Sequence, residues 1–465
     1  MSFYTSLSRH VSAPAMDLLR STRTMARLRE LEESQWWPGE RLAELQAQRL
    51  TQLVSHAYAH VPYYRRVMDE RGVRPQDVRT AADLPKLPVL TRELIRLNFE
   101  DLCADNIPRK RMRKASTGGS TGTPLIFYTT SEDQRNRGFA RGIRAMEFAG
   151  VYLGERRILI RVARQHTARR AKLLHRLSRR IERVVEIDSR NITTASLPSI
   201  IALLREPDMR CFTGYPSAVA FVAAWVLESG LTPPDIDWVV TGGEQLFEHQ
   251  RQRIRDAFHV EPHSKYSCQE VFEVAMECDA HTGLHVAMED IALEIADGAD
   301  APLAPGNEGR VLLTNLHNYA MPLIRYENGD SGSLIAESCP CGRALPLLSY
   351  VVGRRFDMIH TPSGRHITGS NLGSNRLAWF PVLRFQFVQE DIDHLIVRVV
   401  PHPGTSEAQL DDMRLRIPPL FNEVVGNDVH VEVEFHDDIE LTSGGKHLLV
   451  ISKVDPDSWL KRRAT

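Results

Sequence analysis

The chain has 465 residues, which is more than one hydrophobic core usually organises, so we expect more than one domain. Hydrophobic residues make up 42% of the chain and charged residues 25%, a balance typical of globular proteins that excludes a disordered or fibrous class. The formal net charge of −1 excludes a general electrostatic attraction to nucleic acid or to anionic membranes.

Neither a membrane span nor a secretory signal is expected. No stretch approaches the roughly 18 consecutive apolar residues of a membrane span, and residues 1–29 lack an apolar run that ends at a small-residue cleavage site. The six cysteines are too few and too unevenly spaced for a disulfide framework, which favours reduced thiols or metal ligands. The sequence therefore predicts a cytoplasmic protein.

The first predicted elements are helices. Between residues 18 and 71, apolar side chains recur every three to four positions among polar ones, as at Leu42, Leu45, Leu50, Leu53 and Val54. This spacing predicts a helical N-terminal segment within residues 1–107.

After Pro108, short apolar or aromatic runs alternate with helical segments. The runs cover residues 157–162, 210–214, 237–242 and 262–266. An alternation of strands and helices predicts a mainly parallel α/β sheet.

The later strands fall into two further groups. Strands at residues 284–295 and 310–316 stand close together, which favours a smaller β subdomain at about residues 278–345. Beyond Asp357, strands and one helix predict a small α+β domain of about one hundred residues; they cover residues 383–388, 394–400, 406–421 and 429–435. We therefore predict an α/β chain with a large domain at residues 1–357 and a C-terminal lid domain at residues 358–465.

Two basic clusters precede or follow the first strands, at residues 109–114 and 161–183. A solvated amphipathic face explains such clusters in most proteins, and we favour that interpretation. The functional alternative is a binding surface for an anionic cosubstrate, such as the phosphates of coenzyme A.

The strongest local motif is the run Ser116-Thr117-Gly118-Gly119-Ser120-Thr121-Gly122-Thr123-Pro124. Small residues let the backbone approach a polyanion closely, and hydroxyl and N–H groups can bind phosphate oxygens. The run is not a P-loop, because no Lys-Ser/Thr pair follows Gly122. It predicts a site for a nucleotide triphosphate, with a surface turn as the alternative for the loop taken alone.

Further polar motifs follow predicted strands. Thr241-Gly242-Gly243-Glu244 and Tyr266-Ser267-Cys268-Gln269-Glu270 both stand at strand ends, where open α/β sheets collect ligands. Downstream, three motifs supply an acid, a charged hinge-like stretch and a lysine on a glycine loop: Arg325 to Asp330, Gly353 to Asp357 and Thr442 to Lys446.

In this order and spacing, the motifs resemble the signatures of the adenylate-forming superfamily, from about Tyr63 onward. Within it, the chain resembles phenylacetate-CoA ligases in Val61-Pro62-Tyr63-Tyr64, in Leu84-Pro85-Lys86-Leu87-Pro88-Val89-Leu90-Thr91 and in Gly283-Leu284-His285-Val286. The ending, from Leu441 to Lys453, resembles the branch that holds coenzyme F390 synthetases and CapK-type proteins.

The resemblance implies a large N-terminal α/β domain with a β subdomain, and a small mobile α+β domain. It also implies a reaction in which a carboxylic acid and ATP give an acyl-adenylate and pyrophosphate, and the acyl group then passes to coenzyme A. The alternative is an acceptor other than coenzyme A: a hydroxyl, an amine, a sugar or a carrier protein. A non-catalytic nucleotide-binding or zinc-bearing scaffold is a third possibility, against which Lys446 and Glu270 together argue.

The resemblance also implies a set of nucleotide contacts. The β- and γ-phosphates would be held by Ser120, Thr121, Gly122 and Thr123. The adenine would be bordered by Gly243 and Glu244, and the ribose hydroxyls would bind Asp330. Arg354 would add a ribose or phosphate contact, and Asp357 would be the hinge between the domains.

Glu270 and Lys446 are the implied catalytic residues. Glu270, after the nucleotide-site residue Gln269, would help to hold Mg²⁺ beside the α-phosphate, and Lys446 would bridge the attacking carboxylate and that phosphate. A buried Glu270 would be costly without a partner, so we expect a metal or an arginine beside it. Gln269 stands where the superfamily usually has Thr or Ser. Tyr215 and Tyr266 suggest an aromatic or flat acid, although tyrosines at strand ends are as often core residues.

Cys339-Pro340-Cys341-Gly342 places two thiols on a tight turn, and Cys278 and His285 lie upstream. Three sulfurs and one imidazole would make a closed tetrahedral site for structural Zn²⁺, and zinc-bearing members of the resembled family have a similar arrangement. His281 is the alternative imidazole; we favour His285 because it stands on an alternating strand. Ordinary reduced cysteines are the other interpretation.

Overall fold

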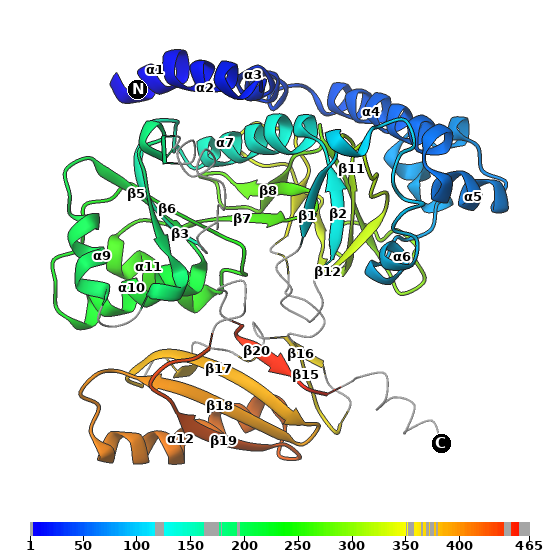
Figure 1. Cartoon of the computed structure of the whole chain (residues 1–465). Helices are drawn as coiled ribbons and strands as arrows, with labels where there is room; N and C mark the ends of the chain where they lie inside the picture. The colour runs from blue at the N-terminus through cyan, green and yellow to red at the C-terminus, as the bar shows by residue number, and fades with distance from the viewer. Residues whose placement is uncertain are drawn as a thin grey trace.

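The structure is a computed structural model and describes residues 3–116, 125–161, 176–177, 179–192, 196–349, 351, 358–363, 366–368, 372, 376–377, 380–440 and 448–454. The N-terminal helices lie along one side of the molecule, the large sheets lie beneath them, and a small domain lies at the opposite side (Figure 1). Within these residues, no helix has both the length and the apolar character required to cross a bilayer.

The predicted helical segment is confirmed. It contains α2 (Ala13–Arg20), α3 (Thr24–Ser34), α4 (Gly39–His60) and α5 (Pro62–Glu70). The apolar positions of α4 at Leu42, Leu50, Leu53 and Val54 are fully buried. Pro62 begins α5, where a missing N–H costs no helical hydrogen bond.

The large sheet has the predicted parallel strands. They are β3 (Arg156–Arg161), β4 (Val184–Asp188), β5 (Met209–Gly214), β6 (Trp238–Gly242) and β7 (His263–Cys268). The strand order is β13-β14-β9-β8-β7-β6-β5-β3-β4, and pairing is parallel from β4 to β7. The connections contain α9 (Leu197–Leu204), α10 (Pro216–Glu228) and α11 (Glu248–Phe258). This architecture confirms the predicted α/β class.

From β7 onward the sheet becomes antiparallel. The added strands are β8 (Phe272–Glu277), β9 (Leu284–Val286), β13 (Leu334–Ile335) and β14 (Leu347–Leu348). A separate antiparallel sheet contains β10 (Ile291–Ala296), β11 (Gly309–Asn315) and β12 (Tyr326–Gly332). The region predicted as one β subdomain, at about residues 278–345, is therefore divided between two sheets.

A short hairpin brackets the glycine-rich run. Its strands are β1 (Arg113–Ser116) and β2 (Ile126–Thr129), and Ser116 pairs with Ile126. Residues 117–124 lie outside the described residues; Ser116 and Ile126, on either side of them, are paired.

A cluster of buried charges joins α7 (Phe139–Phe148) to the turn before β10. The Asp290 carboxylate contacts Arg137 and Arg141, each at 3.0 Å, and His317 at 2.8 Å. These contacts hold the pKa of Asp290 well below its usual range, although burial opposes this. Such a fully buried carboxylate requires several cationic partners, because it has lost its water.

The small domain is an α+β unit, as predicted. Its sheet has the order β19-β18-β17-β20, built from β17 (Val382–Asp391), β18 (His394–Pro401), β19 (His430–Phe435) and β20 (Val450–Ser452). One face packs on α12 (Glu407–Val425) through a core that includes Phe387, Val397 and Phe421. Ser406 caps α12 by accepting from the Gln409 N–H.

The small domain contacts the large domain through β17 and β18. Leu383 and Val400 pack in the same apolar cluster as α10 and α11. The Arg384 guanidinium lies 4.6 Å from the centre of the Phe221 ring, and His402 contacts Glu228. The boundary that the sequence places at residue 357 stays a prediction, because residues 352–357 lie outside the described part.

Candidate active site

A buried carboxylate stands where β7 turns into β8. Glu270 is 2% exposed. The Tyr326 hydroxyl donates to Glu270 Oε1 at 2.5 Å, and Arg92 Nη2 lies 3.6 Å from the same oxygen. Arg92 Nε also donates to the Tyr326 hydroxyl at 3.2 Å. The expected partner of Glu270 is therefore present as an arginine.

Arg92 is a partner of Glu270 that the sequence analysis did not identify. It is the first residue of α6 (Arg92–Leu97), which is capped by the Thr91 hydroxyl. The sequence does give one indication of Arg92, because this residue directly follows Thr91, the last residue of the proline-rich motif. That motif brings α6 against β12 through the pairing of Leu90 with Tyr326.

Asp330 is oriented by its neighbours. Its Oδ2 accepts from the Tyr266 hydroxyl at 2.7 Å and from Asn328 Nδ2 at 2.6 Å. Asn328 Nδ2 also lies 2.6 Å from the Tyr266 oxygen. Burial and the nearby Asp330 raise the pKa of Tyr266 well above its usual value, so the phenol stays protonated and donates. The structure thus places Tyr266 beside Asp330.

Asn328 and Asp330 lie at an irregularity in β12. The register with β11 shifts between Arg310 and Leu312, which leaves Asn328–Asp330 as a bulge, and Gly329 has φ of +92°. A bulge leaves residues unpaired and increases the local twist of a strand. Asn328 and Asp330 stand two positions apart, a spacing that places side chains on one side of a strand, and both contact the Tyr266 hydroxyl on the neighbouring sheet.

The ends of β6 and, beyond it, β5 lie next to β7 in the large sheet. Gly243 follows β6 with φ of +83°, a conformation that strains any residue with a Cβ. Glu244 Oε2 accepts from the Ser217 N–H at 3.2 Å, in the first turn of α10. Tyr215 is the N-cap of α10, so it lies near Glu244. Gln269 is exposed, next to Glu270.

The remaining predicted site residues lie outside the described residues. They are Ser120, Thr121, Gly122, Thr123, Arg354, Asp357 and Lys446. Their roles stay predictions.

A candidate metal centre joins the end of β8, β9 and the loop before β14. Cys278 Sγ lies 3.6 Å from Cys339 Sγ and 3.3 Å from His285 Nε2, and Cys341 Sγ lies 3.4 Å from that nitrogen. One ligand atom from each of the four residues falls within 4.8 Å of the others. A tetrahedral zinc with Zn–S bonds of about 2.3 Å has sulfurs about 3.8 Å apart, so the donor set fits Zn²⁺.

The alternative ligand His281 faces elsewhere. Its Nδ1 lies 3.7 Å from Glu277 Oε2, and its ring lies 4.6 Å from the His263 ring. His281 is also outside the group of residues that share the cluster. The structure therefore favours His285 over His281.

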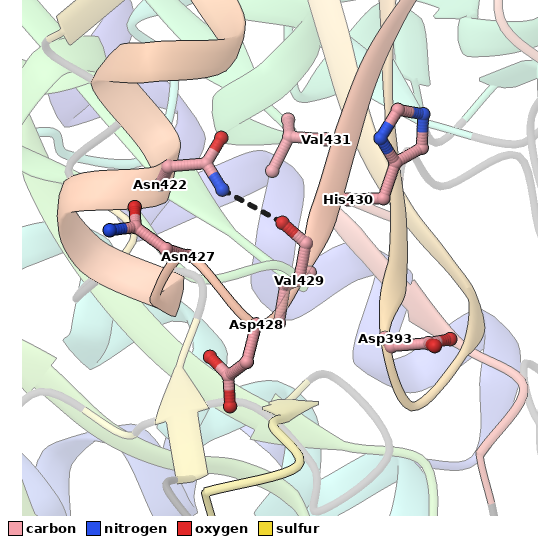
Figure 2. Close-up of a pocket in the computed structure, with 7 residues that line it drawn as sticks. All are labelled: Asp393, Asn422, Asn427, Asp428, Val429, His430 and Val431. Carbon is pink, nitrogen blue, oxygen red and sulfur yellow. Dashed lines mark hydrogen bonds between the residues drawn. The ribbon is translucent and has the colours of Figure 1, made fainter.

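A hollow of about 390 Å³ lies on the small domain, apart from these strand ends. Its lining includes Asp393, Asn422, Asp428 and His430 (Figure 2). Figure 2 shows the Asp393 and Asp428 side chains pointing to different sides, so the polar groups do not converge as they would on a small ligand. We place the candidate active site at the sheet ends and not in this hollow.

The chain is similar to known proteins over most of its length. It is 30% identical over 347 residues to phenylacetate-coenzyme A ligase from Escherichia coli (strain K12), an alignment that covers 68% of this chain and 72% of that protein. It is 24% identical over 428 residues to Protein CapK from Staphylococcus aureus, with 89% of this chain and 90% of that protein covered. The family model described as CapK C-terminal domain matches residues 359–453.

A solved structure has the same fold. The crystal structure of 2-hydroxyisobutyryl-CoA ligase in the postadenylation state, in complex with R3-HIB-AMP, superposes with a TM-score of 0.73. The two sequences are 21% identical, and the match covers 92% of this chain and 93% of that one. This similarity supports the two-domain fold described above.

Proposed function

This chain belongs to the phenylacetate-coenzyme A ligase family, and on that premise we propose that it is an AMP-forming acid–thiol ligase. A carboxylate oxygen attacks the α-phosphorus of ATP and displaces pyrophosphate, which gives an acyl-adenylate. The thiol of coenzyme A then attacks the acyl carbon, and AMP leaves. The observation that carries the proposal is that Arg92 connects the two carboxylates: it lies beside Glu270 and donates to the backbone oxygen of Asn328, whose side chain contacts Asp330.

Glu270 is the proposed Mg²⁺ ligand. Carboxylate oxygens are the ligands that Mg²⁺ prefers, and the bound ion would neutralise phosphate charge. Tyr326 and Arg92 hold the Glu270 carboxylate in place by a hydrogen bond and an ion pair. Gln269 lies beside it at the rim of the nucleotide site.

Asp330 is the proposed ribose ligand. Tyr266 and Asn328 fix its orientation, so the carboxylate needs little reordering when two adjacent hydroxyls bind. Gly243 and Glu244 border the adenine in this proposal, and Arg354 adds a contact to the ribose or a phosphate.

Ser120, Thr121, Gly122 and Thr123 bind the β- and γ-phosphates in this proposal. Lys446 bridges the attacking carboxylate and the α-phosphate, where negative charge accumulates as the two groups approach. The small domain, hinged at Asp357, must then move to withdraw Lys446 and admit the thiol.

Coenzyme A is the proposed acceptor, and an aromatic or flat acid bound near Tyr215 and Tyr266 is the proposed substrate. A second candidate is acyl or adenylyl transfer to another acceptor, such as a hydroxyl, an amine, a sugar or a carrier protein. The match of residues 359–453 to the CapK C-terminal domain is the reason to test that alternative, because the mobile domain contributes to the second step in this proposal.

Zn²⁺ is the proposed occupant of Cys278, His285, Cys339 and Cys341. Four protein ligands close the coordination shell, so the ion would join the end of β8 to the loop before β14 and take no part in the chemistry. Reduced thiols at these positions agree with a cytoplasmic location, which we include in the proposal.

Pyrophosphate release tests the proposed function. The protein is mixed with ATP, Mg²⁺ and a panel of aryl, hydroxy-aryl and fatty acids, with and without coenzyme A. Acid-dependent pyrophosphate release with a thioester product supports the ligase. Acid-dependent release with no effect of coenzyme A favours another acceptor, and no release with any acid contradicts acid activation.

A further inference from the structure

Two histidines and a glutamate meet on the small domain, away from the proposed active site. β18 and β19 run parallel, with His394 opposite His430 and Ile396 opposite Glu432. The two imidazole rings are 5.5 Å apart, at 32° to each other. His394 Nε2 lies 3.0 Å from Glu432 Oε1. One ligand atom from each of the three residues lies within 4.8 Å of the other two.

The backbone holds the three side chains on one face of the sheet. Leu395 and Val431 point into the core beneath α12. Because side chains alternate along a strand, His394, His430 and Glu432 lie on the opposite face. Figure 2 shows the His430 ring on the side of its strand away from Asn422, which belongs to α12.

This face is open to an incoming ion. The His394 and Glu432 side chains are 33% and 42% exposed, His430 is also exposed, and β19 is an edge strand. The contact with the large domain lies near Val400, at the other end of β18. Six residues of strand correspond to about 20 Å, so the cluster does not depend on that contact.

From this geometry we propose that His394, His430 and Glu432 form a surface site for a divalent transition-metal ion of the Zn²⁺ class. Two imidazoles and one carboxylate are a recurrent zinc ligand set, and imidazole also suits Cu²⁺ and Ni²⁺. Zn–N and Zn–O bonds of about 2.0–2.1 Å place ligand atoms about 3.4 Å apart in a tetrahedron, so small side-chain rotations complete the site. The fourth position stays open to water or to a donor from another molecule.

A neighbouring pair provides a matched control. His436 Nε2 lies 3.0 Å from Glu434 Oε2, and both side chains are exposed to a similar degree as His394 and Glu432. This pair lies near the same edge but is not part of a group of potential ligands in the described residues. The pair therefore has the same two residue types and a similar exposure, but within the described residues no third potential ligand joins it.

Zn²⁺ titration of the full-length protein by calorimetry tests the proposal, with His430→Asn, Glu432→Gln and the control His436→Asn. Mutations of outer-shell groups typically weaken metal affinity by about 10–100-fold, so loss of a direct ligand should weaken it by at least about tenfold. His436→Asn should bind as the wild type does. Cys341→Ser should keep this binding event, because the two sites share no residue.

Co²⁺ separates the two sites by spectroscopy. Cobalt bound at Cys278, Cys339 and Cys341 gives thiolate-to-metal charge-transfer absorption, whereas cobalt at His394, His430 and Glu432 gives only ligand-field bands. We expect a ligand-field contribution that His430→Asn removes and His436→Asn retains. The proposal is overturned if the wild type binds no zinc beyond the cysteine site, or if His430→Asn and His436→Asn bind equally.

Discussion

Arg92 Nη2 lies 3.6 Å from Glu270 Oε1, although the two residues are 178 positions apart in sequence. Tyr326 contacts both side chains. Arg92→Ala should therefore lower acid-dependent pyrophosphate release by at least tenfold and destabilise the fold by about 1.5–3 kcal/mol, since a buried carboxylate loses a charged partner. Arg92→Lys should recover part of the activity and part of the stability, because lysine restores the positive charge but not the planar guanidinium group.

The matched control for Arg92 is Arg96→Ala, on the exposed side of the same helix. Steady-state rates and urea unfolding of the three variants make the comparison. Wild-type activity in Arg92→Ala would show that Glu270 does not depend on this partner.

Asp330 and the glycine-rich loop should act on different parts of ATP. Asp330→Ala should weaken ATP and AMP alike, by about 1.5–3 kcal/mol if both ribose hydrogen bonds to the carboxylate are lost. Thr121→Ala should weaken ATP and spare AMP, which lacks the β- and γ-phosphates. Calorimetry with AMP and a non-hydrolysable ATP analogue measures the two affinities of each variant. If Thr121→Ala weakened AMP as much as the ATP analogue, the loop would not bind the β- and γ-phosphates.

Lys446 should serve adenylation and not thioester formation. Lys446→Ala should remove most pyrophosphate release but retain much of the reaction of a presynthesised acyl-adenylate with coenzyme A, because charge develops beside the ammonium only in the first step. Rapid-quench assays of the two half-reactions provide the comparison. Similar losses in both would contradict the assignment.

The cysteine cluster should hold about one zinc. Protein purified without added metal should contain close to one equivalent, and Cys341→Ser should lower the metal content and the unfolding temperature together, since binding energy at such a site is folding energy. Cys103→Ser is the control, because Cys103 lies outside the cluster. A metal-free wild type whose stability is unchanged by chelator would rule the zinc out.

Glu147 on α7 should make stability depend on pH. Burial, and then the nearby Glu32, raise the pKa of Glu147 from its ordinary value of 4.5 to about 8. Glu147 binds its proton more tightly in the folded state than in the unfolded state, so the folded protein becomes less stable as pH rises from about 4.5 to about 8. Above that range the loss of stability is complete. Glu147→Gln should therefore be more stable than the wild type at pH 8.5, with a smaller difference at pH 5.

Urea unfolding at the two pH values measures this, with Glu33→Gln on the exposed side of α3 as the control. If the stability difference between Glu147→Gln and the wild type grew toward acid pH, the raised pKa of Glu147 would be contradicted.

More of the fold than of the candidate site could be predicted from the sequence. Strands such as β3, β5 and β6 were predictable because buried parallel strands form short apolar runs between helices. The proximity of Cys278, His285, Cys339 and Cys341 followed from their donor types and a resemblance, and the structure brings them together.

The remaining features depend on tertiary contacts that no local pattern encodes. In the sequence, little distinguishes Arg92 from the other arginines. The packing of α6 beside β12 brings it to Glu270. The sequence suggested Tyr266 as a residue near the acid, but it gave no sign that the Tyr266 hydroxyl contacts Asp330. The β12 bulge beside this contact has no sequence signal beyond Gly329.

An oxygen-isotope experiment tests the central claim, acid activation through an acyl-adenylate, most directly. A substrate acid from the pyrophosphate screen is labelled with ¹⁸O in both carboxylate oxygens and incubated with ATP, Mg²⁺ and coenzyme A. Attack on the α-phosphorus, followed by release from the acyl carbon, leaves one labelled oxygen in AMP, which mass spectrometry detects. One ¹⁸O in AMP is the predicted result; label in inorganic phosphate with ADP as the nucleotide product, or unlabelled AMP, would contradict the account.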